Sequence, residues 1–413
     1  RYGFFPSVGA GWVVSQEQFF EPLQDLFQLF KFRFSYGLVG NSRISGRRFA
    51  YIATVANASG YTFGENMDNY YPGKDIGDYA SDVSWEVAHK TNFGLNIDAL
   101  NGKISLQANY FKQHRTGIFL QRNSLPYYLG LRSSPYGNVG VIDNHGIDGT
   151  LTWNGNLGDF HFQLIGNFTW TRNKVIQNDQ PEPKYPWLDK KGLKVGQTFG
   201  YVALGLFESK KEIENSPKQN GDVRSGDIKY KDINGDGKID SYDRMAIGYG
   251  DIPEVVYGLG FSFSYKSFSL TGLFQGVGNV DILLSGEGFQ PFQQGLSRGN
   301  LLSNITDRWT VKNPDPHAFY PRLSPGTVND NYEASTWWLK NGRYLRLKSL
   351  QFSYDLPQTF LDRLNLKNAY VFLTGVNLLT FTPFDVFDVE LGNGKGAAYP
   401  NTKNYSAGFG LKF

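Results

Sequence analysis

Residues 160–170 have the sequence FHFQLIGNFTW, in which apolar and mainly polar positions alternate. The first set is Phe160, Phe162, Leu164, Gly166, Phe168 and Trp170, and the second is His161, Gln163, Ile165, Asn167 and Thr169. Successive side chains of an extended strand point to opposite faces of a sheet. The stretch therefore predicts a β-strand with one apolar and one polar face.

The same alternation recurs along the chain and predicts eleven strands. They lie near residues 7–14, 29–39, 85–99, 103–112, 142–153, 159–171, 256–265, 268–277, 344–355, 369–378 and 404–413. The runs are typically about 9–11 residues long, which is the length that a tilted strand needs to cross a bilayer. Strands of soluble proteins have about 5–6 residues.

A soluble sandwich would show the same alternation, with its polar face outside. Two observations favour a transmembrane antiparallel β-barrel instead. The polar faces consist mostly of Ser, Thr, Asn, Gln and Gly, as expected for a water-filled lumen. Aromatic residues stand at strand ends beside short links, including Trp153, Phe160, Tyr265 and Phe268, as in the girdles at membrane interfaces.

The links between the strands alternate between short and long. Short links fall near 15–28, 100–102, 154–158, 266–267 and 357–367, and long links near 40–82, 114–139, 172–255, 279–342 and 380–403. Outer-membrane barrels have short periplasmic turns and long extracellular loops, so each strand direction can be assigned. Eleven strands would leave two free edges in lipid, which predicts a missing N-terminal set of strands. A start at Arg1 is typical of a mature chain or a fragment.

Composition argues against several classes of protein. The 413 residues contain no cysteine, and 41 basic residues nearly balance 38 acidic ones, which disfavours disulfide scaffolds, thiolate sites and nucleic-acid binding. The five histidines lack metal-site spacing, and no nucleophile elbow, P-loop or dinucleotide fingerprint is present. We therefore expect a protein that is not an enzyme.

One segment within the long 172–255 loop matches a calcium-binding loop of twelve residues. Calcium takes six to eight oxygen ligands, at loop positions one, three, five, seven, nine and twelve, with glycine at position six. The matching residues are Asp232, Asn234, Asp236, Lys238 through its carbonyl, Asp240 and Asp243, with Gly237 at position six. The alternative is a polar turn rich in Asp and Gly. A bound calcium ion would have a structural role and would hold the loop in place.

The second long loop, residues 279–342, contains aromatic residues that suit a sugar ligand. Trp337, Trp338, Tyr320 and Tyr332 could stack on sugar rings, or they could pack this loop over the barrel. Asp388 and Glu390 follow the strand near 369–378, and a loop contact is a better interpretation of them than catalysis.

Taken together, the motifs resemble the SusC/RagA family of TonB-dependent outer-membrane transporters of Bacteroidetes. The similar segments are Tyr2-Gly3-Phe4-Phe5-Pro6, Phe34-Ser35-Tyr36-Gly37, Gly226-Asp227-Ile228-Lys229-Tyr230, Arg308-Trp309-Thr310, Tyr344-Leu345-Arg346-Leu347-Lys348 and Asn377-Leu378-Leu379-Thr380. The resemblance covers the whole chain. Val389 departs from it, because the family usually has proline there, which concerns only the local loop conformation.

The resemblance implies a barrel of 22 strands, of which residues 1–413 would form the C-terminal half. It also implies an N-terminal plug, a SusD-like surface lipoprotein as a lid, and the TonB-ExbB-ExbD complex as energy source. The expected function is import of oligosaccharides or oligopeptides across the outer membrane of a Gram-negative bacterium. A siderophore or cobalamin receptor of the same superfamily, and a surface β-structured enzyme or adhesin, are the alternatives.

Overall fold

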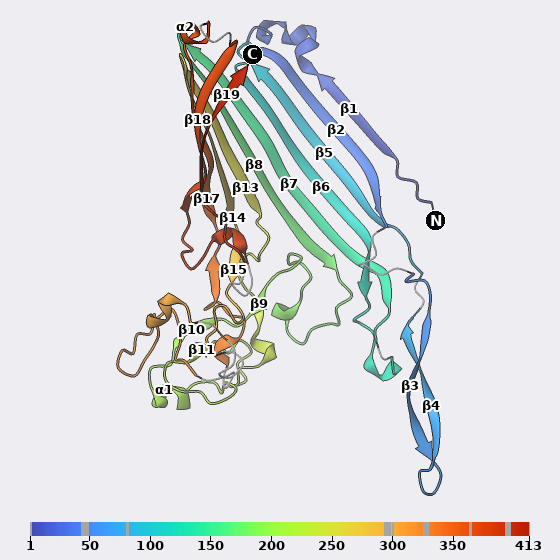
Figure 1. The fold of residues 1–413 in the computed structure, drawn as a ribbon. Helices are drawn as coiled ribbons and strands as arrows, with labels where there is room; N and C mark the ends of the chain where they lie inside the picture. The colour runs from blue at the N-terminus through green and yellow to red at the C-terminus, as the bar shows by residue number, and fades with distance from the viewer. Residues whose placement is uncertain are drawn as a thin grey trace.

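The chain folds around one antiparallel sheet of eleven strands (Figure 1). The computed structural model describes residues 2–42, 49–79, 82–131, 133–292, 299, 301–324, 330–362, 366–392 and 398–412. In spatial order the strands are β1 (Ser7–Val13), β2 (Phe27–Asn41), β5 (Glu86–Ala99), β6 (Ile104–Gln121), β7 (Tyr136–Leu157), β8 (Phe160–Gln177), β13 (Val255–Tyr265), β14 (Phe268–Gly278), β17 (Tyr344–Asp355), β18 (Asn368–Phe381) and β19 (Asn404–Lys412). The predicted all-β fold is confirmed, and Phe413, the predicted end of the last strand, lies outside the described residues.

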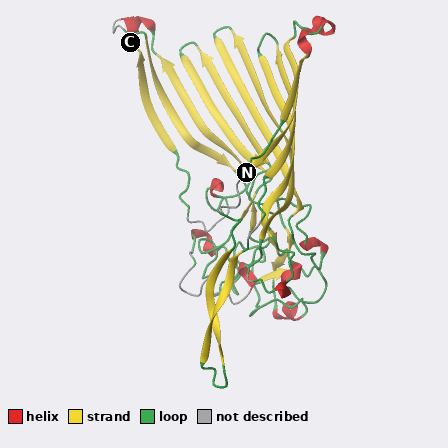
Figure 2. Cartoon of the chain, turned by 90° about the vertical axis from the view of Figure 1, so that its right-hand side faces the viewer, coloured by secondary structure: helices red, strands yellow, loops and turns green. Residues whose placement is uncertain are grey.

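Each strand pairs with the next strand of the sheet along the chain, so the sheet is an up-and-down meander. Figures 1 and 2 show its short links at one end and its long links gathered at the other. The tight turn after β5 uses left-handed backbone at Leu100, Asn101 and Gly102, with φ of 57°, 59° and 77°. We refer to the two ends as periplasmic and extracellular, following the rule for outer-membrane barrels.

Besides short 3-10 helices, the long links contain the smaller strands and one α-helix. These are β3 (Thr54–Phe63), β4 (Asn69–Asp78), β9 (Phe199–Gly200), β10 (Ala203–Leu206), α1 (Lys210–Glu214), β11 (Ile228–Tyr230), β12 (Met245–Ala246), β15 (Asp281–Leu283) and β16 (Leu339–Asn341), while the short helix α2 (Gln358–Leu361) lies in a periplasmic link. The long link near 40–82 contains the β3–β4 hairpin, which the sequence did not predict. Within the described ranges, the structure has no helix with the length and apolar character to span a membrane.

Strands β6, β7 and β8 are longer than the sequence predicts. They have 18, 22 and 18 residues, so the predicted limits at residues 112, 142 and 171 are wrong. The pairing of β6 with β7 continues as far as Gln121 and Tyr136. Main-chain hydrogen bonds between strands form whether or not the side chains alternate between apolar and polar. The strand pairing therefore continues beyond the residues at which the apolar alternation stops.

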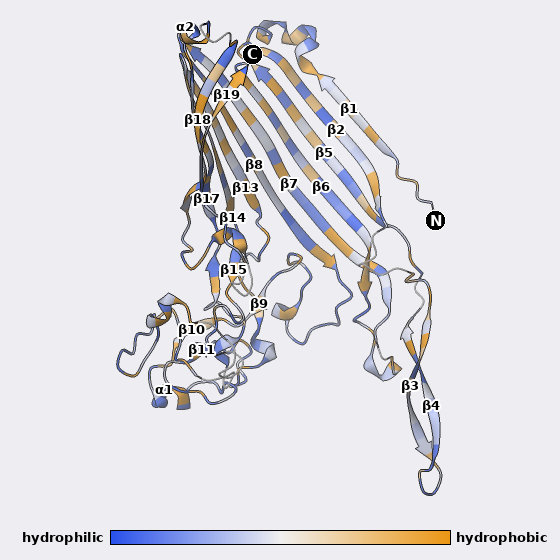
Figure 3. Cartoon of the chain, viewed as in Figure 1, coloured by the Kyte–Doolittle hydropathy of each residue, from blue (hydrophilic) through white to orange (hydrophobic). Residues whose placement is uncertain are grey.

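The two faces of the sheet have different surroundings. One face carries exposed apolar side chains, such as Phe34, Phe93 and Leu151 with 37%, 52% and 47% of their surface accessible, and Figure 3 shows the resulting apolar and polar bands. On the opposite, mainly polar face, Val277 and Tyr344 are buried in a core formed by the extracellular loops. The extracellular loops pack against the polar face of the sheet. The apolar face is left uncovered and is therefore the one suited to contact with lipid.

Aromatic rings gather on the apolar face near the periplasmic end. The ring centroids of Trp153 and Phe162 are 5.1 Å apart, and those of Phe268 and Tyr354 are 4.8 Å apart on other strands. Trp153 and Phe268 are about half exposed, with 47% of their surface accessible in each case. Half-exposed aromatic rings in a row are characteristic of the girdle where a barrel meets the lipid headgroups.

Candidate functional site

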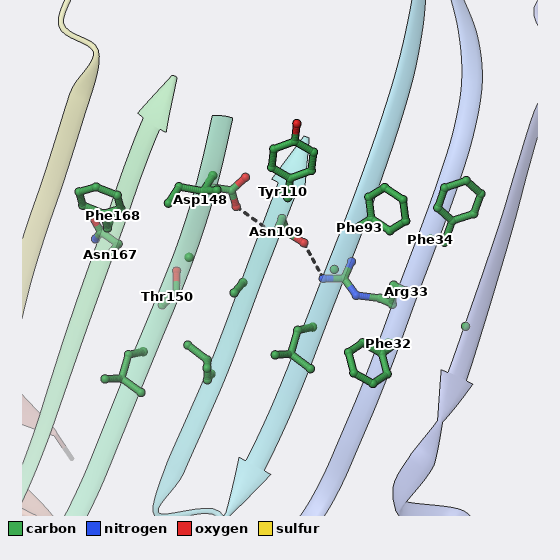
Figure 4. A pocket seen from close by; sticks show the side chains of 18 of the residues that line it. Phe32, Arg33, Phe34, Phe93, Asn109, Tyr110, Asp148, Thr150, Asn167 and Phe168 are labelled. Atoms are coloured by element: carbon green, nitrogen blue, oxygen red, sulfur yellow. Dashed lines mark hydrogen bonds between the residues drawn. The ribbon is translucent and has the colours of Figure 1, made fainter. Parts of the chain in front are cut away.

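A hydrogen-bonded row of polar side chains crosses β2, β5, β6 and β7 on the polar face, and Figure 4 shows its members Arg33, Asn109 and Asp148. Arg33 of β2 donates from Nε to Asn96 Oδ1 at 2.7 Å and from Nη2 to Asn109 Oδ1 at 2.8 Å. Asn109 of β6 then donates from Nδ2 to Asp148 Oδ1 of β7 at 2.8 Å. The row thus connects a cation to a carboxylate through an amide.

The register of the strands and one glycine make this row possible. Gly94 of β5 lies opposite both Arg33 and Asn109. A Cβ atom at Gly94 would lie 2.7 Å from Arg33 Cζ and 2.9 Å from Asn109 Oδ1. The absence of a side chain at residue 94 therefore lets the guanidinium group cross β5. Arg33 alternates with Phe32 and Phe34 in the sequence, which places it on the polar face. A charge in the middle of a membrane-crossing strand is a signal that it has a partner.

The extracellular loops form a module with its own core, contributed by the 172–255, 279–342 and 380–403 links. Its largest fully buried side chains include Phe207, Ile228, Tyr230, Tyr320 and Trp338. The module also contains a buried acid, Asp227, which is 1% exposed. Arg322 donates to both carboxylate oxygens of Asp227, at 3.0 Å and 2.8 Å. This ion pair joins two loops that are far apart in the sequence.

A second ionic cluster fixes the 380–403 link to β17 on the polar face. Arg346, with 3% of its surface accessible, bonds Asp388 Oδ1 at 2.5 Å and Glu390 Oε2 at 3.1 Å. Burial opposes ionisation of Asp388, but the hydrogen bonds from Arg346 and from main-chain N–H groups outweigh it and hold its pKa below the ordinary value. Lys348 also reaches Glu390, at 3.2 Å. The two acids therefore make the loop contact that the sequence favoured over catalysis.

The four aromatic residues predicted to bind a ligand lie inside this module. Trp338 and Tyr320 are each 1% exposed, and the Trp338 indole N–H donates to the Asn331 carbonyl at 2.7 Å. Trp337 and Tyr332 are half-buried and donate to the carbonyls of Phe319 and Pro291. Trp338 and Tyr320 therefore pack the loop, which is the second of the two interpretations. Stacking on a sugar remains a prediction for the half-buried Trp337 and Tyr332.

The predicted calcium loop is tightly curled by hydrogen bonds to its own carboxylates. Asp232 accepts N–H bonds from Gly235 and Gly237 at 2.7 Å and 2.9 Å, and the fully buried Asp243 accepts them from Ile233 and Asp240 at 2.8 Å and 2.9 Å. Each carboxylate oxygen keeps a second lone pair for another interaction.

The donor set of this loop suits a hard cation only in part. In the part of the chain that the structure describes, no three His, Asp or Glu side chains are grouped so as to hold a metal ion. Calcium would therefore also need Asn234 and main-chain oxygens such as that of Lys238, both of which are normal calcium ligands. The predicted metal ligands thus remain a prediction.

Comparison with known proteins shows what this architecture is similar to. No family model matches the chain. The TonB-dependent receptor P3 of Formosa agariphila is 26% identical over 443 aligned residues, covering 100% of this chain and 42% of the relative. The TonB-dependent receptor SusC of Bacteroides thetaiotaomicron is 24% identical over 433 residues, covering 100% and 40%.

Among solved structures, the RagAB peptide importer in its open-open state matches with a TM-score of 0.75 at 24% identity, covering 99% of this chain and 42% of that chain. The resemblance to the SusC/RagA family is confirmed. The relatives are named as TonB-dependent receptors and the solved neighbour as a peptide importer, which agrees with the predicted outer-membrane location and with the prediction of a transporter rather than an enzyme. The chain spans less than half the length of each of these relatives.

Proposed function

We propose that the chain forms the C-terminal half of the barrel of an importer that is driven by TonB-ExbB-ExbD. The observation that carries this proposal is the eleven-stranded meander. Among the described residues, β1 pairs only with β2 and β19 only with β18, so both edges of the sheet are free. Free edges are unfavourable in lipid, where each unpaired main-chain group costs several kcal/mol. A further set of strands and a plug would complete the barrel.

The imported nutrient would be an oligosaccharide or an oligopeptide, taken up together with a SusD-like lipoprotein. The name of one solved neighbour, the RagAB peptide importer, supports a peptide, and the resemblance to the SusC/RagA family implies the wider class. The loop module lies on the polar face at the extracellular end, where it would narrow the entrance to the lumen and could contact a lid. The chain would contribute binding and sealing, with no chemical change to the nutrient.

The test is growth of a strain that lacks the intact transporter. We expect slower growth on one panel, either oligosaccharides or oligopeptides too large for porins, and normal growth on the corresponding monomers. Uptake in the parent strain should stop when the proton gradient is collapsed. Normal growth on both panels combined with loss of iron-chelate or cobalamin uptake would overturn the proposed nutrient class in favour of the first alternative. Turnover of a substrate by the purified protein would favour an enzyme.

We also propose that calcium holds the segment 232–243 in place. Asp232, Asp236, Asp240 and Asp243 lie within twelve residues, and within the described part of the chain none has a cationic group within 4.0 Å. A cation would relieve their mutual repulsion. At a calcium concentration of 100 times its Kd, we expect the loop module to gain about 2.7 kcal/mol, measured as a rise in melting temperature that EDTA reverses.

The matched pair of variants for this test is Asp236→Asn and Asp251→Asn. Asp236 is exposed and supplies the predicted ligand at position five, while Asp251 is an exposed acid of the same loop outside the motif. Calcium titration calorimetry should show weaker binding only in the first variant. No heat of binding at millimolar calcium in the wild-type protein would contradict the proposal.

A further inference from the structure

Basic side chains are concentrated on the lipid-facing side of β5 to β8, just beyond the extracellular end of the apolar band. Lys112 of β6, His145 of β7 and Arg172 of β8 lie directly opposite one another in one cross-strand row. His89, His114, Asp143 and Lys174 form the next row outward. These rows share the face of Phe93, Tyr110, Ile147 and Trp170, which form the row immediately below them.

Two of these cations have no acidic partner. Within the part of the chain that the structure describes, neither Lys112 nor Lys174 has a carboxylate within 4.0 Å, and both are exposed. Asp143, the one acid in the two rows, bonds His114 Nδ1 at 2.5 Å. Arg172 bonds Glu254 through both ends of its guanidinium group at 2.9 Å and keeps 49% of its side chain accessible. The two lysines are therefore available to an external anion.

A furrow of about 880 Å³ lies directly below these rows on the same face (Figure 4). Its floor contains the small residues Ala108, Gly149 and Gly166 on three successive strands. Phe93, Tyr110 and Phe168 stand at its sides, and each is 41–52% exposed. Hydrocarbon chains suit a furrow of this shape and composition.

The furrow's own cross-strand row continues on the other side of the sheet. From Phe168 it runs through Tyr257 of β13, Gly276 of β14, Leu345 of β17 and Phe381 of β18, without a basic side chain. The exposed Arg343, just outside β17, lines a separate hollow with Tyr257, Leu345 and Phe381, so a basic residue also lies beyond the apolar band on that side. What distinguishes β5 to β8 is that two lysines without an acidic partner lie directly above the furrow, which places a charged and an apolar part in one site.

We propose that β5 to β8 hold a phosphorylated lipid of the outer leaflet. Its phosphate groups would bind Lys112 and Lys174, with Arg172 and His145 beside them, and an acyl chain would fill the furrow. Ammonium and guanidinium groups are the usual protein partners of phosphate. The inference rests on the outer-membrane location and not on the transported nutrient, so the growth test above and the lipid test below can fail independently.

The test uses the intact transporter purified in mild detergent, with bound lipid counted by native mass spectrometry during titration with diphosphorylated lipid A. We expect the Lys112→Gln, Lys174→Gln double variant to bind at least tenfold more weakly than wild type. The matched control is Lys90→Gln, an exposed lysine of β5 on the opposite, lumenal face, which should bind as wild type does. The same lipid without its phosphates should also bind at least tenfold more weakly.

A second variant tests the furrow without changing charge. A Cβ atom at Gly166 would have no neighbour within 4 Å, so Gly166→Leu should fold normally and fill the furrow. We expect it to weaken lipid A binding at least fivefold. The proposal would be overturned if the double variant bound lipid A as tightly as wild type, or if Lys90→Gln lost as much affinity as the double variant. It would also be overturned if millimolar inorganic phosphate displaced the lipid completely. The last result would indicate a phosphate site that does not use the furrow.

Discussion

Replacing Asp227 by alanine should open the extracellular loop module while the barrel strands stay folded. The carboxylate is 1% exposed and accepts four hydrogen bonds, two from Arg322, one from Asn331 and one from the Arg224 main chain. Removing it leaves the Arg322 guanidinium, only 18% accessible, without its counter-ion. Breaking one side of a buried ion pair costs about 3–5 kcal/mol, which is a large part of the stability of a loop module.

Hydrogen exchange and limited proteolysis of residues 199–246 measure this effect, and retained heat-resistant mobility on gels reports an intact barrel. The matched control is Asp222→Ala, which removes an exposed ion pair with Arg224 in the same loop, at 57% and 64% side-chain accessibility. Solvent screens that pair, so we expect little change. Equal protection in the two variants would show that the buried pair does not hold the loops together.

The sequence predicted the sheet well because alternation is a local property. A residue and its neighbour two positions along share a face whatever lies elsewhere in the chain, and short turns such as Asn101-Gly102 define which strands are adjacent. The β3–β4 hairpin and the outer parts of β6 to β8 were missed for the complementary reason. No regular apolar alternation marks their limits, although single apolar side chains such as Phe119 and Val175 are buried there.

The candidate sites were harder to predict because they depend on contacts between distant segments. Asp227 and Arg322 are 95 positions apart, and Arg33 and Asn109 are 76 apart. Composition shows that each residue is charged or polar, but only the fold shows its partner. The same limit applies to Trp338 and Tyr320: aromatic residues in a loop look alike in sequence whether they bind a ligand or fill a core, and burial decides between these roles.

Introducing arginine at Ala108 should prevent the barrel from being stably inserted, whereas arginine at the adjacent Gln107 should be tolerated. Ala108 lies on the apolar face between Leu95 and Gly149, near the middle of the apolar band. A charge on the lipid face at the bilayer midplane costs about 2–4 kcal/mol. Gln107 is exposed on the polar face, where an arginine side chain would remain in water. The measurement is the unfolding free energy in lipid vesicles together with the amount of folded protein in outer-membrane fractions.

Ala108→Leu separates charge from size in this experiment, because leucine enlarges the side chain without requiring desolvation of a charge. We expect Ala108→Leu to insert normally, although it should reduce lipid A binding if the furrow holds an acyl chain. The contrast between positions 107 and 108 depends only on which face meets lipid, since the two residues share a strand and a depth. If the arginine at 107 were the damaging one, the Phe and Tyr rows would face inward. The free edges of the sheet, β1 and β19, would then not lie in lipid, so no further strands would be required to pair with them. The proposed pore and the proposed lipid site would both lose their physical basis.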